Sequence, residues 1–192
     1  MRIYEIFRKT KETYICIKIN LDGSCLFNIN IINFFLKHML NHFVINSSFD
    51  LYILSSSDTY IDLHHFMEDI GIILGICIKY SVFNKNNINR YGFSYVPLDE
   101  SLSRVVLDFS GRSYLKYDLF SNKIYLGNLE IDLFYDFFLS FSLNSGITLH
   151  IINLYGYNIH HKIESIFKSF GISLKNSLIF KIGLNSSKGY LF

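Results

Sequence analysis

One short pattern of metal-binding residue types occurs twice in this chain: two adjacent histidines followed, three residues after the second, by a glutamate. The copies are His64-His65-x-x-Glu68 and His160-His161-x-x-Glu164. Imidazole and carboxylate together suit Mn, Fe, Co, Ni or Zn, and a helix places residues three and four apart on one face. For a single copy, histidines that cap a helix start beside a surface glutamate are the plainer explanation. Because the chain has only 7 His, the duplication favours a centre with two metal ions.

Three further histidines stand outside the pairs, namely His38, His42 and His150. Adjacent side chains in an extended segment point to opposite sides, so we infer that the two histidines of each pair serve different metals. Six His and two Glu then divide into two sites of three His and one Glu. Ligands that point apart in one chain imply that neighbouring subunits complete the sites. The predicted ligands are His38, His64, His65, Glu68, His150, His160, His161 and Glu164.

The composition excludes several classes of protein. The chain has 192 residues, 50% of them hydrophobic and 18% charged, which suits one domain or two fused halves with a real core. A net charge of +2 argues against a general nucleic-acid binder. Apolar runs are shorter than the roughly 18 residues of a membrane span. The first residues lack the basic and then apolar pattern of a signal peptide. The 3 Cys are scattered along the sequence, which is typical of reduced thiols. We therefore expect a cytoplasmic protein that binds neither nucleic acid nor membrane.

The periodicity of apolar residues predicts an α+β protein made by internal duplication. Each half has the order strand-strand-helix-strand-helix, with a histidine pair where its last strand meets its last helix, and the sheets pack against the helices. We place the halves at 1–86 and 87–192, joined by a polar connector at 84–89, with a Ser/Lys/Gly tail at 185–192. The predicted strands are 13–20, 49–55, 60–63, 104–109, 114–117 and 148–154, and the predicted helices are 34–43, 64–80, 129–143 and 160–174.

The residues around both patterns resemble known motifs. Residues 61–71, IDLHHFMEDIG, are similar to the first metal motif of the imidazoleglycerol-phosphate dehydratase family, and residues 148–164 are similar to its second. Other segments resemble the same family in the same order, so that the resemblance runs from residue 10 to the end of the chain. These segments are 35–40, 90–92, 97–100, 107–112, 167–168 and 186–189.

The resemblance implies a reaction, a cofactor and an assembly. The reaction is the dehydration of D-erythro-imidazoleglycerol phosphate to imidazoleacetol phosphate in histidine biosynthesis. Two Mn²⁺ ions per active site would hold the imidazole as an imidazolate, whose electron density expels the neighbouring hydroxyl through a diazafulvene-like intermediate. The resemblance also implies halves like domain 2 of ribosomal protein S5, and a homo-oligomeric shell of 24 subunits, built from trimers, with active sites between subunits.

The resemblance further assigns substrate-binding residues outside the two patterns. Glu12 matches a carboxylate that we expect to bind the substrate and to act as acid or base toward the carbon-bound proton. Another set matches phosphate-binding positions, where Arg offers a planar fork, Lys a point charge and Ser a hydroxyl group. This set is Arg90, Arg112, Lys168, Ser186, Ser187 and Lys188. Asp99 and Glu100 are expected to orient ligating histidines.

Several positions depart from the family's pattern. Lys37 and Leu63 replace aspartates that precede the first histidine ligands, and Asn46 stands where a histidine is common. Bulky residues at 31–34 replace a small Thr-Gly or Ser-Gly turn, so we expect that loop to follow a different path. All the predicted metal ligands are nevertheless present.

Two other functions stay open with the same ligands. One is a dimetal hydrolase that acts on a phosphorylated small molecule. The other is a non-enzymatic metal-bound shell whose activity has decayed. If the dehydratase assignment holds, His65→Ala should cost far more activity than His42→Ala, because His42 has no counterpart among the family's ligands.

Overall fold

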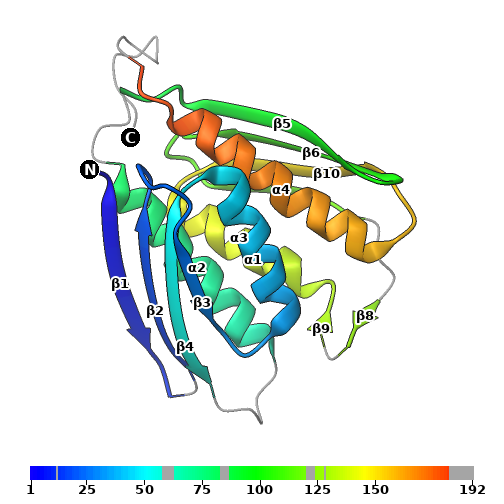
Figure 1. The fold of residues 1–192 in the computed structure, drawn as a ribbon, viewed down its shortest axis with the longest axis horizontal. Helices are drawn as coiled ribbons and strands as arrows, with labels where there is room; N and C mark the ends of the chain where they lie inside the picture. The colour runs from blue at the N-terminus through cyan, green and yellow to red at the C-terminus, as the bar shows by residue number, and fades with distance from the viewer. Residues whose placement is uncertain (12, 58–62, 83–86, 120–123, 128, 182–192) are drawn as a thin grey trace.

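Two four-stranded sheets and the helices that cover them make up the described part of the computed structural model (Figure 1). The structure describes residues 1–11, 13–57, 63–82, 87–119, 124–127 and 129–181. The first half contains β1 (Ile3–Lys9), β2 (Thr13–Asn20), β3 (Phe27–Asn30), α1 (Phe34–Ser47), β4 (Asp50–Ser57) and α2 (Leu63–Ser81). The second half contains β5 (Tyr91–Leu98), β6 (Ser101–Asp108), β7 (Tyr114–Asp118), β8 (Tyr125–Leu126), β9 (Leu129–Glu130), α3 (Leu133–Ser145), β10 (Thr148–Tyr155) and α4 (Ile159–Leu178).

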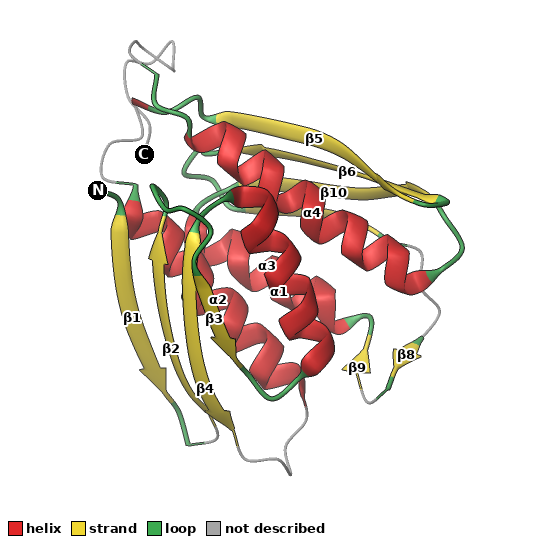
Figure 2. Ribbon diagram, viewed as in Figure 1, coloured by secondary structure: helices red, strands yellow, loops and turns green. Residues whose placement is uncertain are grey.

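The two halves share one topology, as Figure 2 shows. The first sheet has the strand order β1-β2-β4-β3 and the second has the order β5-β6-β10-β7. In each sheet the first three strands are antiparallel and the last pair is parallel. The predicted α+β duplication is therefore confirmed, with one strand more before the first helix in the first half and three more in the second, where β8 and β9 form a small sheet of their own.

Local sequence explains these elements. In β2, Ile15, Ile17 and Ile19 are fully buried and alternate with more exposed residues, as a strand with one face on a core requires. Helix α1 begins after Asn33, whose side chain accepts a hydrogen bond from the backbone N–H of Leu36. Ser48 caps its C-terminal end: it takes a left-handed conformation and donates its backbone N–H to the carbonyl of Val44 in the preceding turn.

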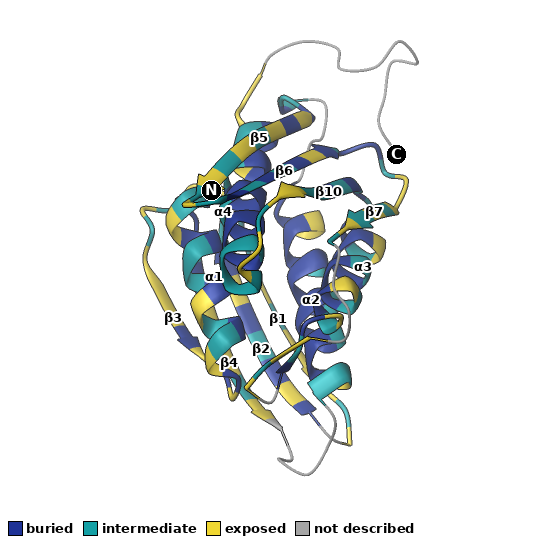
Figure 3. Cartoon of the chain, turned by 90° about the vertical axis from the view of Figure 1, so that its right-hand side faces the viewer, coloured by how far each residue is buried: buried dark blue, intermediate teal, exposed yellow. Residues whose placement is uncertain are grey.

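The helices pair across the two halves rather than within them. Helix α1 packs against α4 and α2 packs against α3, so the buried residues in Figure 3 form one core shared by both halves. Glycines allow this close approach: a Cβ added to Gly75 would lie 2.7 Å from the carbonyl oxygen of Phe141, and one added to Gly171 would lie 2.6 Å from that of Phe43. Each of these contacts joins a helix of one half to the backbone of the other.

Some predicted elements differ in the structure. The helix predicted at 129–143 is wrong at its start, because Leu129 and Glu130 form β9, which pairs with β8, and α3 begins only at Leu133. Most of the strand predicted at 60–63 lies outside the described residues, and Leu63 belongs to α2. Strands β1, β3, β5 and β8 were not predicted either. None of the described helices is both long and apolar enough to cross a membrane.

Candidate active site

Three predicted ligands from two helices meet at one carboxylate. His38 comes from α1, and His160 and Glu164 come from α4, which packs against α1. The Oε2 atom of Glu164 lies 3.3 Å from Nε2 of His38 and 3.1 Å from Nε2 of His160. One ligand atom of each residue falls within 4.8 Å of the other two. Two imidazoles and one carboxylate at this spacing could hold a divalent transition metal.

The other oxygen of Glu164 has its own partners. Oε1 lies 2.7 Å from Nζ of Lys168, one turn further along α4, and 3.1 Å from Nε2 of His42 in α1. Burial raises the pKa of Glu164, but the hydrogen bond from Lys168 and the charges around it outweigh burial and hold the pKa below its ordinary value. Burial lowers the pKa of His42. Lys168, predicted to bind the substrate phosphate, therefore contacts a predicted metal ligand in this structure.

Two other predicted ligands have a carboxylate on their Nδ1 atom. Nδ1 of His64 lies 3.1 Å from Oδ2 of Asp136 in α3, and Nδ1 of His161 lies 2.7 Å from Oε2 of Glu100. The contact with Glu100 raises the pKa of His161 and lowers that of Glu100 to about 2. A carboxylate on Nδ1 fixes the ring and leaves Nε2 for a metal. The expectation that Glu100 orients a histidine agrees with this contact.

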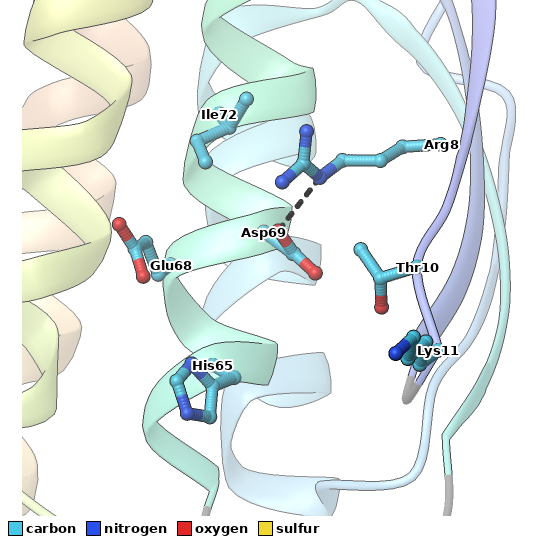
Figure 4. Close-up of a pocket in the computed structure, with 7 residues that line it drawn as sticks. All are labelled: Arg8, Thr10, Lys11, His65, Glu68, Asp69 and Ile72. Atoms are coloured by element: carbon cyan, nitrogen blue, oxygen red, sulfur yellow. Dashed lines mark hydrogen bonds and ion pairs between the residues drawn. The ribbon is translucent and has the colours of Figure 1, made fainter.

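His65 and Glu68 face a separate polar pocket of about 310 Å³. Figure 4 shows Arg8 reaching from β1 toward Asp69 of α2, with the other lining residues around this ion pair. Asp69 is buried and accepts hydrogen bonds from Nε of Arg8 at 2.8 Å and from Oγ1 of Thr13 at 2.6 Å. The pocket thus combines cations, carboxylates and an imidazole, and its lining is Arg8, Thr10, Lys11, His65, Glu68, Asp69 and Ile72.

The remaining described candidates belong to the second sheet and its loops. His150 is on β10, with its ring centroid 5.7 Å from that of Tyr114. Arg90 is buried and donates hydrogen bonds to both carboxylate oxygens of Asp108, from Nε at 2.6 Å and from Nη2 at 3.1 Å. Arg112, by contrast, is exposed. Four further candidates lie outside the described residues, namely Glu12, Ser186, Ser187 and Lys188.

Sequence reasoning missed several side chains that contact predicted ligands or line their pocket, and three of them make direct polar contacts that shape the site. They are His42, Asp136 and Arg8. His42 carried one signal, since it stands one helical turn after His38 and so shares its face of α1. Asp136 and Arg8 carried none, because each approaches its partner from a different element.

The fold and the site define a class of protein: a duplicated α+β protein with a candidate metal site where helices of its two halves meet. Comparison with known proteins gives the family. A sequence profile described as imidazoleglycerol-phosphate dehydratase matches residues 32–174. The chain belongs to the imidazoleglycerol-phosphate dehydratase family, lyases of histidine biosynthesis.

Relatives and solved structures agree with this assignment. The chain is 47% identical over 175 residues to an imidazoleglycerol-phosphate dehydratase of Paraburkholderia phymatum, covering 91% of this chain and 90% of the relative. It is 44% identical over 194 residues to that of Listeria welshimeri, covering 100% of both. The crystal structure of the Staphylococcus aureus enzyme superposes with a TM-score of 0.83 at 36% identity, covering 93% of this chain and 99% of that one. The structure from Pyrococcus furiosus, in complex with (S)-C348, has a TM-score of 0.84 at 30% identity and covers 97% and 100%.

These comparisons confirm the predicted family, fold class and dehydratase function in histidine biosynthesis. The possible metal site agrees with the predicted need for a metal.

Proposed function

We propose that the chain dehydrates D-erythro-imidazoleglycerol phosphate to imidazoleacetol phosphate in the cytoplasm, using two Mn²⁺ ions per active site. The observation that carries the proposal is the meeting of His38, His160 and Glu164, since the family's reaction needs a Lewis acid on a ring nitrogen and these side chains provide ligands for one. The family membership of the chain supplies the substrate class.

The donor atoms in this structure fit manganese. His38, His160 and Glu164 would hold one ion through two Nε2 atoms and one carboxylate oxygen. His64 and His161 each have a carboxylate on Nδ1, which would orient the ring and make Nε2 the nitrogen that binds a metal. When bound, the metals would act as Lewis acids toward the imidazole ring and as a template that orients it. The rest of the proposed ligand set is His65, Glu68 and His150.

Neighbouring subunits would complete the sites. His65 and Glu68 line their own pocket, so one chain presents its proposed ligands in separate groups. The side chains of His38 and His160 are 46% and 42% exposed, which leaves room for groups from another chain. Strand β5 also exposes a row of aromatic residues that an adjacent subunit would cover. We propose the 24-subunit shell built from trimers as this assembly.

The remaining proposed residues would bind the substrate and move its proton. Glu12, next in sequence to Lys11 of the pocket, would take or give the carbon-bound proton while the hydroxyl leaves as water. Arg112 is exposed and can grip phosphate oxygens with its guanidinium. Arg90 is buried and held by Asp108, and its guanidinium would add positive charge to the phosphate site. Lys168 would contribute charge, with Ser186, Ser187 and Lys188 completing the phosphate site.

Turnover tests this proposal. Purified protein would be assayed with imidazoleglycerol phosphate, first loaded with Mn²⁺ and then after exhaustive chelation. We expect imidazoleacetol phosphate only from the loaded enzyme, and none from Glu164→Gln. Glu5→Gln, a matched change at an exposed glutamate of β1, should keep full activity. Release of inorganic phosphate instead would indicate the hydrolase, and an assembled, metal-loaded sample without product would indicate the decayed shell.

A further inference from the structure

We propose that His42 is a positioning residue of the metal site at Glu164. Its imidazole holds one oxygen of the Glu164 carboxylate, so that the other oxygen alone faces the ligands His38 and His160. The inference rests on the proposed binding of a metal by Glu164.

The geometry divides the contacts of Glu164 between its two oxygens. Nε2 of His38 and Nε2 of His160 lie near Oε2, whereas Nε2 of His42 lies 3.1 Å from Oε1. His38 and His42 stand one turn apart on α1, and their ring centroids are 4.5 Å apart at an interplanar angle of 74°. One face of α1 therefore presents two imidazoles to the same carboxylate, one to each oxygen.

Two donors act on Oε1. Lys168 donates from Nζ at 2.7 Å, and His42 would donate from Nε2–H. A carboxylate oxygen that already accepts two hydrogen bonds has no lone pair left for a metal. Glu164 would therefore bind the metal through Oε2 only, and His42 would select this mode.

Lys168 alone would not fix the carboxylate as well. Its ammonium is a compact charge on a flexible stem and can follow Oε1 as the carboxylate turns. The ring of His42 has few rotamers and sits on a packed helix, so it differs from Lys168 in stiffness although both side chains are 21% exposed. Partners that hydrogen-bond to a ligating carboxylate commonly change metal affinity when they are removed.

Metal binding by three variants tests the inference. Metal-free full-length protein would be titrated with Mn²⁺ and free Mn²⁺ followed by electron paramagnetic resonance, with the absorption spectrum of the Co²⁺-loaded protein as a second readout. We expect His42→Leu to weaken binding about tenfold and to change the Co²⁺ spectrum. His42→Gln keeps an N–H donor at similar reach and should restore most of the affinity. Ile45→Gln, at an exposed position of the same helix, should bind as the wild type does.

The outcomes distinguish the positioning role of His42 from the metal binding by Glu164 on which it rests. If Glu164→Gln leaves Mn²⁺ affinity unchanged, the metal assignment fails and the inference fails with it. If Glu164→Gln weakens binding but His42→Leu does not, or if His42→Gln is as weak as His42→Leu, the positioning role alone is overturned. Adding His42→Leu to Glu164→Gln should cause no further loss. Thermal unfolding of the metal-free variants checks that each one folds.

Discussion

Which nitrogen each histidine presents follows from where its carboxylate partner lies. His38, His42 and His160 direct Nε2 at Glu164. His64 and His161 instead have a carboxylate on Nδ1. The partner on one ring nitrogen decides which tautomer a neutral imidazole adopts. For His64 and His161 the carboxylate therefore favours the proton on Nδ1, whereas the proton of neutral His38 and His160 faces Glu164 on Nε2 and would have to leave if a metal bound there.

Asp136 offers a test of this arrangement at the level of one side chain. We expect Asp136→Ala to weaken Mn²⁺ binding by about 10- to 100-fold, because His64 would lose the partner that orients its ring. A calorimetric titration of the metal-free protein measures the affinity. Asp132→Ala is the control, since the Asp132 side chain makes no capping hydrogen bond at the start of the same helix. Equal affinities for both variants would contradict the role of Asp136.

The sequence predicts part of this site and not the rest, for physical reasons. His160 and Glu164 are one helical turn apart, so their meeting follows from local spacing, whereas the contact of His38 with Glu164 depends on how α1 packs against α4. The contact between His64 and Asp136 depends on how α2 packs against α3, which no local pattern encodes. Asn46 was noted as a departure from the family, and its side chain donates to the carbonyl of His42 in the preceding turn of α1.

At the scale of elements, the close contact between α1 and α4 is the feature that brings proposed ligands from two helices together. Gly171→Ala should destabilise the protein by about 1–3 kcal/mol, because the new Cβ would lie 2.6 Å from the backbone oxygen of Phe43. The gain in helix propensity is at most about 1 kcal/mol, so the clash decides the sign. Urea unfolding measures the difference, and Lys162→Ala on α4 is the control. An equally stable Gly171→Ala would show that the helices can separate freely.

A second contact ties Arg2, just before β1, to Leu178 at the end of α4. Asp22 accepts from Nε and Nη2 of Arg2, whose Nη1 donates to the carbonyl of Leu178. The hydrogen bond from Arg2 lowers the pKa of Asp22. Because the folded pKa is lowered, the ion pair stabilises the fold above the ordinary pKa of about 3.9 and loses that effect as the pH falls below it.

Asp22→Asn should therefore remove a pH-dependent contribution to stability. The wild type should exceed the variant by less than about 1 kcal/mol at pH 7, because the Asp22 side chain is 40% exposed and solvent screens the pair. The difference should shrink as the pH falls below about 4. Urea unfolding of both proteins across this range provides the measurement, and a constant difference would contradict the ion pair's role.

Elements with a clear period were the predictable ones. The strand at 13–20 has the predicted bounds, and the predicted helices at 34–43, 64–80 and 160–174 lie inside α1, α2 and α4. Strand β1 escaped prediction because its second half is exposed throughout, which erases the alternation. The error at 129 arose because Leu129 and Ile131 are buried before α3 begins, and apolar residues at a strand end extend the apparent helical pattern.

At the scale of the whole molecule, proposed ligands divided between separate groups link metal binding to assembly. If metals join subunits, chelation should break the shell into smaller species such as trimers, because ligands of neighbouring subunits would no longer be bound to the same metal ion. Multi-angle light scattering before and after chelation measures the mass, and returning Mn²⁺ should restore it. A metal-free preparation that keeps its full mass would show that other contacts hold the shell.

The glycine contacts between the halves also limit how this chain can change over generations. Gly75 and Gly171 stand at the same distance after the first histidine of their pairs, and each meets the backbone of the opposite half. A larger residue gained in one half must therefore be accommodated by the other, so substitutions in the two copies are selected jointly. Neither copy can therefore change freely at these contacts while the other stays the same.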